Sequence, residues 1–166
     1  MLSSKLIRTL TLGLSLTGAA AFAGDEAGNA GANVQLNCPS GTKQFGNPND
    51  GVYCRKPVSK DGYNLPHGPY VSYYPNGQKR SVGQYFEGFR SGTWTFYDEA
   101  GKQTGRTEFS GDNYHGKRVQ YFANGKPRLV EEYVNGKRNG LTQEFAEDGK
   151  LVREAQYRDD KLADAK

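Results

Sequence analysis

The chain has 166 residues, of which 35% are hydrophobic and 12% aromatic, and it carries 22 glycines. So few hydrophobic residues exclude a large buried core, whereas so many aromatic residues exclude a simply disordered chain. The formal net charge is +4, but residues 1–23 hold two of the 22 basic residues, and the rest of the chain has 20 basic and 18 acidic residues, a net charge of +2. That near balance argues against a nucleic-acid-binding protein, which needs clustered basic surface.

Residues 1–23 have the pattern of a secretory signal peptide. Lys5 and Arg8 give a positive start, and the uncharged run from Leu10 to Ala23 ends in Ala-Phe-Ala. A retained signal anchor is the alternative, but the apolar run is shorter than the roughly 20 residues that a membrane-spanning helix needs. We therefore expect an exported mature chain that starts near Gly24, has no transmembrane segment, and works in the periplasm or outside the cell.

Two further segments precede the main body of the chain. Residues 24–33 (GDEAGNAGAN) are small and polar, which is typical of a flexible linker. Residues 34–66 are predicted to form a small cap tied by a disulfide between Cys38 and Cys54, because an isolated cysteine pair in an exported protein usually bonds. The pair has no clustered histidines to complete a zinc site, and its spacing is not the CxxC of redox enzymes. Within the cap, residues 52–56 are predicted to form a strand, followed by a turn at Asp61-Gly62, and the strand is expected to pair with the first hairpin.

Residues 67–162 consist of four copies of a 24-residue unit that align without a gap. The units are 67–90, 91–114, 115–138 and 139–162. The second place is always glycine: Gly68, Gly92, Gly116 and Gly140. The eleventh place is always glycine as well: Gly77, Gly101, Gly125 and Gly149. The seventh place is always aromatic, in Tyr73, Tyr97, Tyr121 and Phe145, and so is the nineteenth, in Tyr85, Phe109, Tyr133 and Tyr157. Fixed columns at a fixed period indicate a repeat architecture.

Each unit is predicted to be one β-hairpin. Tyr74-Pro75-Asn76-Gly77 fits a type I turn that closes on a residue with positive φ, a conformation that glycine adopts without a Cβ penalty. The flanking runs are rich in Tyr, Phe, Val and Thr, which favour strands. Second turns are expected near Gly88, Asp112, Gly136 and Asp160. The prediction is an all-β fold: an elongated, twisted antiparallel β-meander of about eight strands, with the disulfide-tied cap before it and residues 163–166 as a tail.

The same units carry a family resemblance. Tyr70 and Trp94 lie just after the first glycine of their units, Asn76-Gly77 and Asn124-Gly125 form the central turn, and Gly136-Lys137-Arg138 ends a unit. Over residues 67–162 this pattern resembles the bacterial MORN-repeat variant family, as in the YwqK-type antitoxin-like proteins. The cap, with Cys38-Pro39-Ser40-Gly41 and a second cysteine, is similar to that of exported members. The chain departs from the pattern at Arg118 and Thr142, where an aromatic residue is expected, and at residues 111–114. The resemblance implies a curved β-sheet used for association, and membrane or lipid links in some members.

No arrangement in the sequence meets the requirements of a catalytic or metal site. His67 and His115 share a column, but two units separate them, which is roughly 19 Å at the spacing of neighbouring strands, too far to share one ion. Glu131 and Glu132 are adjacent on a strand and therefore point to opposite faces. No serine lies on a nucleophile elbow. We predict a protein that is not an enzyme and has no cofactor.

The aromatic residues offer the one candidate site. The seventh-place aromatics are expected to form the core of the sheet, while a second set is a candidate binding stripe: Tyr70, Tyr74, Trp94 and Phe122. Exposed Tyr and Trp with neighbouring Arg suit protein contacts, and also lipid headgroups or glycans. The hypothesis is a non-catalytic scaffold that binds an unidentified protein in the cell envelope. The alternatives are an adaptor that contacts lipid or glycan, and an antitoxin or immunity-type factor that neutralises a toxin.

Overall fold

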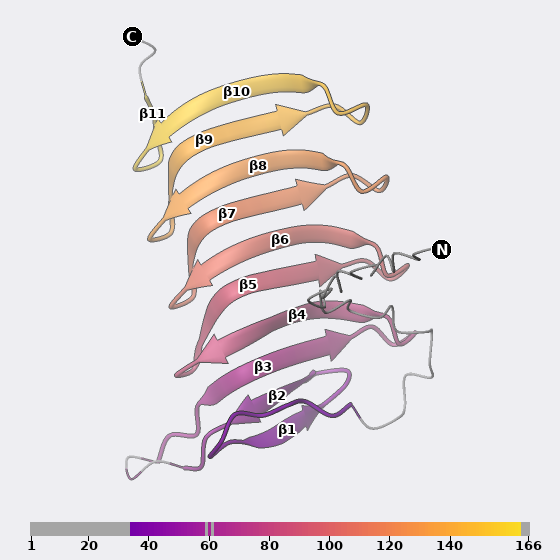
Figure 1. Ribbon diagram of the computed structural model, residues 1–166, viewed down its shortest axis with the longest axis vertical. Coiled ribbons are helices and arrows are strands. Elements are labelled where there is room, and N and C mark those ends of the chain that lie inside the picture. The colour runs from indigo at the N-terminus through magenta and orange to yellow at the C-terminus, as the bar shows by residue number, and fades with distance from the viewer. Residues whose placement is uncertain (1–33, 59, 61, 164–166) are drawn as a thin grey trace, which may run out of the picture.

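The computed structural model describes residues 34–163 except 59 and 61, so the predicted signal peptide, the linker and residues 164–166 lie outside the described residues. The chain forms one open antiparallel sheet of eleven strands, each paired with its neighbours in sequence (Figure 1). The strands are β1 (Lys43–Asn47), β2 (Gly51–Arg55), β3 (Pro66–Tyr73), β4 (Lys79–Phe86), β5 (Phe89–Tyr97), β6 (Gln103–Ser110), β7 (Asn113–Tyr121), β8 (Pro127–Val134), β9 (Lys137–Phe145), β10 (Leu151–Arg158) and β11 (Lys161–Leu162). The predicted all-β meander is confirmed: its eight strands are β3 to β10, and β1, β2 and β11 extend it. In the part of the chain that the structure describes, no helix is long and apolar enough to cross a membrane.

The turn within each hairpin has the geometry that the eleventh-place glycine predicts. In the first hairpin the Gly77 N–H donates to the Tyr74 carbonyl (2.9 Å) and the Tyr74 N–H donates to the Gln78 carbonyl (2.8 Å). Gly77, Gly101, Gly125 and Gly149 have φ of +89°, +79°, +82° and +95°. A residue with a Cβ adopts this region at a cost, so glycine at this place fixes the turn and the register of the two strands.

The turns between hairpins are two-residue turns with positive φ, which match the twist of antiparallel strands. Glu87, Asp112, Asn135 and Asp160 adopt positive φ there without being glycine. Two kinds of anchor alternate along the sheet. At the first and third turns the Glu87 N–H donates to His67 Nδ1 (3.4 Å) and the Asn135 N–H to His115 Nδ1 (3.5 Å). At the second and fourth turns Asp112 and Asp160 accept from the backbone N–H and Nε of Arg90 and Arg138, respectively.

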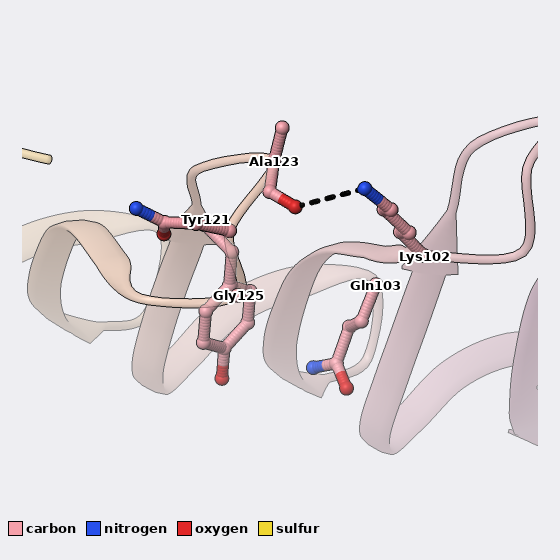
Figure 2. A pocket seen from close by; sticks show the side chains of 6 residues that line it. Lys102, Gln103, Tyr121, Ala123 and Gly125 are labelled. Carbon is pink, nitrogen blue, oxygen red and sulfur yellow. Dashed lines mark hydrogen bonds between the residues drawn. The ribbon is translucent and has the colours of Figure 1, made fainter.

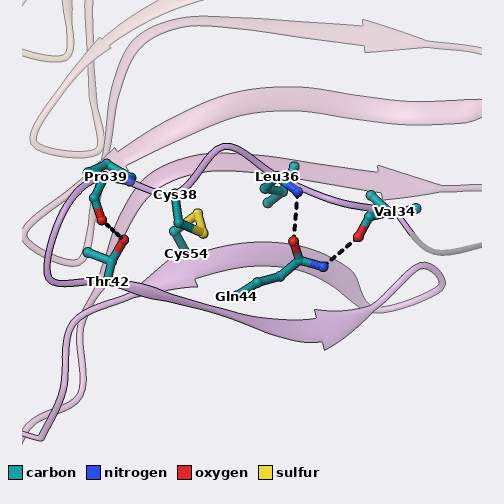
Figure 3. Close-up of a disulfide and its surroundings, with 7 residues drawn as sticks. All are labelled: Val34, Leu36, Cys38, Pro39, Thr42, Gln44 and Cys54. Carbon is teal, nitrogen blue, oxygen red and sulfur yellow. Dashed lines mark hydrogen bonds between the residues drawn. A yellow bond between two sulfur atoms is a disulfide. The ribbon is translucent and has the colours of Figure 1, made fainter.

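The N-terminal cap is tied as predicted. The disulfide Cys38–Cys54 joins the segment before β1 to β2 (Figure 3), with Cα atoms 5.5 Å apart. The Gln44 side chain holds the same segment, because its Oε1 accepts from the Leu36 N–H (2.7 Å) and its Nε2 donates to the Val34 carbonyl. β2 pairs with β3, which confirms the strand expected there. The expected turn at residues 61 and 62 is only partly within the described residues.

The sheet is a single layer, so its core is thin. Among the described residues, the buried hydrophobic side chains are Val52, Cys54, Val71, Trp94 and Phe109. On one face a chain of ring contacts, here called the ring ladder, runs across the strands with centroids 5.1 to 6.2 Å apart. Its members are Tyr70, Tyr85, Trp94, Phe109, Tyr114 and Tyr133. The seventh-place aromatics are only half-buried, and strand alternation turns them to the other face, so the expectation that they form the core is wrong.

Candidate binding surfaces

Trp94 has a specific seat in the first two hairpins. Gly83 lies opposite it on β4, and a Cβ on Gly83 would meet the indole ring at 2.3 Å, so the absence of a side chain lets the ring lie flat on the strand. The indole Nε1–H donates to the Gln84 carbonyl (3.1 Å), and the Tyr85 ring packs edge-on at 5.2 Å. The Tyr70 ring covers the other side at 5.1 Å. Trp94 is therefore only 4% exposed, and its expected place in an exposed stripe is wrong.

The other predicted stripe residues are split between two places. Tyr70 is half-buried and joins Trp94 in the ring ladder. Tyr74 and Phe122 instead begin the hairpin turns of the first and third units, where the Tyr74 hydroxyl donates to the Tyr97 carbonyl (2.9 Å). The structure brings Tyr70 and Trp94 together but does not join them to Tyr74 and Phe122 in one exposed row.

The ring-ladder face changes character in the last two hairpins. Arg118 occupies the place of Trp94 and forms an ion pair with Glu131, whose side chain is 8% exposed. A hollow of about 200 Å³ opens beyond this pair. It is lined by Leu129, Glu131, Arg138, Thr142, Glu144, Arg153, Ala155 and Tyr157. Thr142 has no ring to fill the space, and its buried Oγ1 has no hydrogen-bond partner among the described residues.

A wider hollow of about 610 Å³ lies between the turns of the second and third hairpins (Figure 2). Figure 2 shows Tyr121 and Gln103 pointing to the same side, below a bridge in which Lys102 Nζ donates to the Ala123 carbonyl (3.3 Å). Asn124 and Gly125 complete the lining. Lys102 is the single charged residue here, so this hollow has no pair of groups suited to acid–base chemistry.

An exposed apolar surface lies at the first turn between hairpins. Phe86 and Phe89 face each other across this turn and are 60% and 54% exposed, and Leu65, 37% exposed, lies against Gly88. We call Leu65, Phe86 and Phe89 the apolar corner. The sequence did not lead us to predict this surface. It does carry a signal, because the residues equivalent to Phe86 and Phe89 at the next turn are the polar Ser110 and Asn113.

Charged groups border the apolar corner. Glu87 forms an ion pair with Lys56, and its carboxylate lies 3.1 Å from His67 Nδ1. The hydrogen bond that Lys56 donates holds the pKa of Glu87 below its ordinary value, so this carboxylate is charged at neutral pH. An apolar centre with a charged border is the usual composition of a protein-binding patch.

The other perturbed groups have structural causes. Burial, followed by the neighbouring Tyr70, raises the pKa of Tyr85, and burial, followed by the Glu131 carboxylate, raises the pKa of Tyr133. Both rings belong to the ring ladder, where Tyr85 packs against Tyr70 and Tyr133 packs against Tyr114. In the described part of the chain no three His, Cys, Asp or Glu side chains gather in a group that could hold a metal ion.

The comparison with protein families identifies the repeats. The model of the MORN repeat variant matches residues 66–86, 114–135 and 138–159, which correspond to the first, third and fourth hairpins. The second hairpin, β5 and β6, has the same geometry outside the matched residues, and its unit is the one that ends in the unusual residues 111–114. No curated protein matched the chain. With three matched repeats between residues 66 and 159, the chain belongs to the MORN repeat variant family.

Proposed function

We propose that this chain is a non-catalytic scaffold that binds another protein in the cell envelope through the apolar corner. The observation that carries the proposal is the exposure of two adjacent phenylalanines, Phe86 at 60% and Phe89 at 54%, in a chain that has few hydrophobic residues. Leaving two such rings in water is unfavourable, and clustered exposed apolar side chains usually mark a contact surface.

The surroundings of the apolar corner favour a protein partner. Large aromatic side chains are the commonest anchors of protein interfaces, and a charged border such as Lys56 and Glu87 gives such an interface its orientation. The disulfide of the neighbouring cap limits how far this region can open, so the corner is presented on a fixed base.

The proposed location follows from the disulfide and from the sequence pattern of residues 1–23. Disulfides persist in oxidising compartments and are rare in the cytosol. Cys38 and Cys54 are the chain's two cysteines and both are in the bond, which supports a structural rather than a redox role. The periplasm or the cell exterior is therefore the proposed place of action.

The chain itself supplies a substitution that tests the proposal without disturbing the fold. Phe86→Ser with Phe89→Asn gives the first turn the residues that the next turn already has, Ser110 and Asn113. The partner is captured by cross-linking from the envelope fraction, identified, purified and titrated with the wild-type chain and the variant. We expect about tenfold or greater loss of affinity in the double variant, since each ring is an interface anchor.

Val134→Ser is the matched control, because Val134 occupies the same column at the third turn and is 42% exposed. It is expected to leave the affinity unchanged. Equal binding by wild type and the double variant, with both folded by circular dichroism, would contradict the proposal. Salt-sensitive co-sedimentation with anionic vesicles, in place of a protein complex, would assign the corner to a lipid surface.

A further inference from the structure

The last long strand of the sheet carries residues similar to those that hold Trp94. On β4 that seat is Gly83-Gln84-Tyr85: a residue without a side chain below the indole, a carbonyl that accepts from Nε1, and a ring beside it. On β10 the same places hold Ala155-Gln156-Tyr157. The intervening strands differ, with Thr107-Glu108-Phe109 on β6 and Glu131-Glu132-Tyr133 on β8.

The two seats differ in what lies over them. β5 pairs along β4 and brings Trp94 onto the first seat. Beside β10, β11 pairs with Tyr157 and Arg158 alone, and the Ala163 N–H donates to the Gln156 carbonyl. Among the described residues no strand pairs with the outer edge of Leu151–Ala155, and Figure 1 shows β10 as the last long strand of the sheet. Leu151 and Val152 are 49% and 65% exposed.

The hollow of about 200 Å³ spans β8, β9 and β10 and reaches this second seat, since Ala155 and Tyr157 line its β10 side. A volume of this size holds one aromatic side chain. A Cβ at Gly83 would meet the Trp94 ring at 2.3 Å, so a ring over Ala155 must shift away from the strand, and the hollow beside Thr142 and Arg153 gives it that room. The Thr142 Oγ1, which lacks a partner among the described residues, is then available to a polar group on the ring.

We propose that the outer edge of β10 binds an extended segment of a partner protein, which adds one antiparallel strand to the sheet and places a tryptophan or tyrosine ring over Ala155. The inference rests on the proposed function, because it names a second contact with a protein partner. Backbone hydrogen bonds to an open sheet edge supply general affinity, and a pocket for one side chain supplies specificity. The model for the bound strand is β5 on β4, which the fold itself contains.

The test uses the whole chain and a defined probe, a synthetic peptide with the sequence of residues 90–98 (RSGTWTFYD), blocked at both ends. Titration of the isotope-labelled protein by NMR is expected to shift the amide signals of Leu151–Tyr157 and the Thr142 signal. The same peptide carrying Trp94→Ser is expected to bind about tenfold more weakly or worse, because it lacks the ring.

Two substitutions at Ala155 with opposite expected effects on peptide affinity separate a loss of binding from a loss of folding. Ala155→Leu fills the hollow and is expected to weaken binding about tenfold or more, whereas Ala155→Gly recreates the Gly83 seat and is expected to tighten it. Val134→Ser, on an inner strand, is the control and should change nothing. The proposal is overturned if the peptide produces no shifts at millimolar concentration, if the Trp94→Ser peptide binds equally well, or if the shifts lie elsewhere.

The remaining outcomes separate the possible occupants and the two proposals. Self-association of the chain alone that Ala155→Leu abolishes, measured by sedimentation velocity, would assign the edge to a second copy and overturn the proposal. Peptide binding at β10 in the Phe86→Ser, Phe89→Asn variant would support the edge site even if the apolar corner has no partner. Partner binding at the corner without peptide binding would overturn the edge site alone.

Discussion

The first two and the last two hairpins have matching strands and turns, but they cover the ring-ladder face with different side chains. In the first two, Tyr70, Tyr85, Trp94 and Phe109 pack against one another, and two of these rings are buried. In the last two, Arg118 pairs with Glu131, and a hollow lies beside Thr142 and Ala155. The turns therefore set the backbone, since the strands are the same whether rings or charged side chains cover them. We infer that the first half supplies most of the stability and that the second half retains room for a ligand.

The largest difference in stability between the two halves is expected at Trp94. Trp94→Ala removes a buried ring and leaves a cavity, which costs about 4 kcal/mol of unfolding free energy. Thr142→Ala, the same column in the fourth unit, should cost less than about 1 kcal/mol, because its hydroxyl has no hydrogen-bond partner among the described residues. Urea denaturation of both variants checks the difference. Equal losses would show that the two halves are equally packed.

The disulfide is the second strongest contribution, and it lies in the cap that precedes the first two hairpins. Replacing both cysteines by serine opens a loop with a sequence separation of 16 and should cost about 3 kcal/mol. The same loss should follow from reduction of the wild-type chain, because no cysteine of the chain is outside this bond. A melting temperature that reductant does not change would show that the cap does not unfold cooperatively with the rest of the sheet.

The pair of Arg118 and Glu131 tests the second half. Arg118→Met leaves a carboxylate that is 8% exposed without its cation, which should cost about 2 kcal/mol because the charge stays buried. Adding Glu131→Leu should recover most of that loss, since a well-packed apolar pair replaces a buried ion pair at little cost. A thermodynamic cycle over the four proteins measures the coupling. Additive effects would show that the pair does not stabilise this face.

The smallest expected effect is a loss of folding stability at acidic pH. Burial tends to raise the pKa of Asp112, but the hydrogen bonds from Arg90 outweigh it and hold this pKa below its ordinary value. Because the folded-state pKa is the lower one, the contribution is present above the unfolded pKa and is lost as the pH falls through the folded value. The pair is exposed and screened, so the loss is well under about 1 kcal/mol. Asp112→Asn should flatten this part of the stability curve between neutral and acidic pH, and an unchanged slope would contradict the assignment.

The sequence was sufficient to predict the backbone. The hairpin turns at Gly77, Gly101, Gly125 and Gly149 depend on local conformational preference, which a glycine at a fixed place expresses directly. The 24-residue period then sets which strands are neighbours, because short turns make sequential strands pair. The strand in the cap was predicted by its apolar residues, whereas β1, with five exposed residues, had no such signal.

The face that carries the core could not be predicted from alternation alone. Alternation separates Tyr70 and Trp94 from Tyr73 and Tyr97, but it does not say which side is deeper in a sheet one layer thick. The strand pairing shifts register just before Tyr73 and Tyr97, and Gly83 has no side chain that would exclude the Trp94 ring. The missing side chain opposite the tryptophan was the usable sequence signal. The place of Leu65 in the apolar corner could not be predicted, because this loop residue meets the first turn only in three dimensions.

Hydrogen exchange of the backbone amides, measured strand by strand on the whole chain, tests the central claim most directly. If the packed rings of the first half hold the sheet together, amides of β4, β5 and β6 should exchange only through global unfolding, and those of β9 and β10 should exchange faster through local opening. Uniform protection from β3 to β10, or slower exchange in β9 and β10 than in β4 to β6, would contradict it.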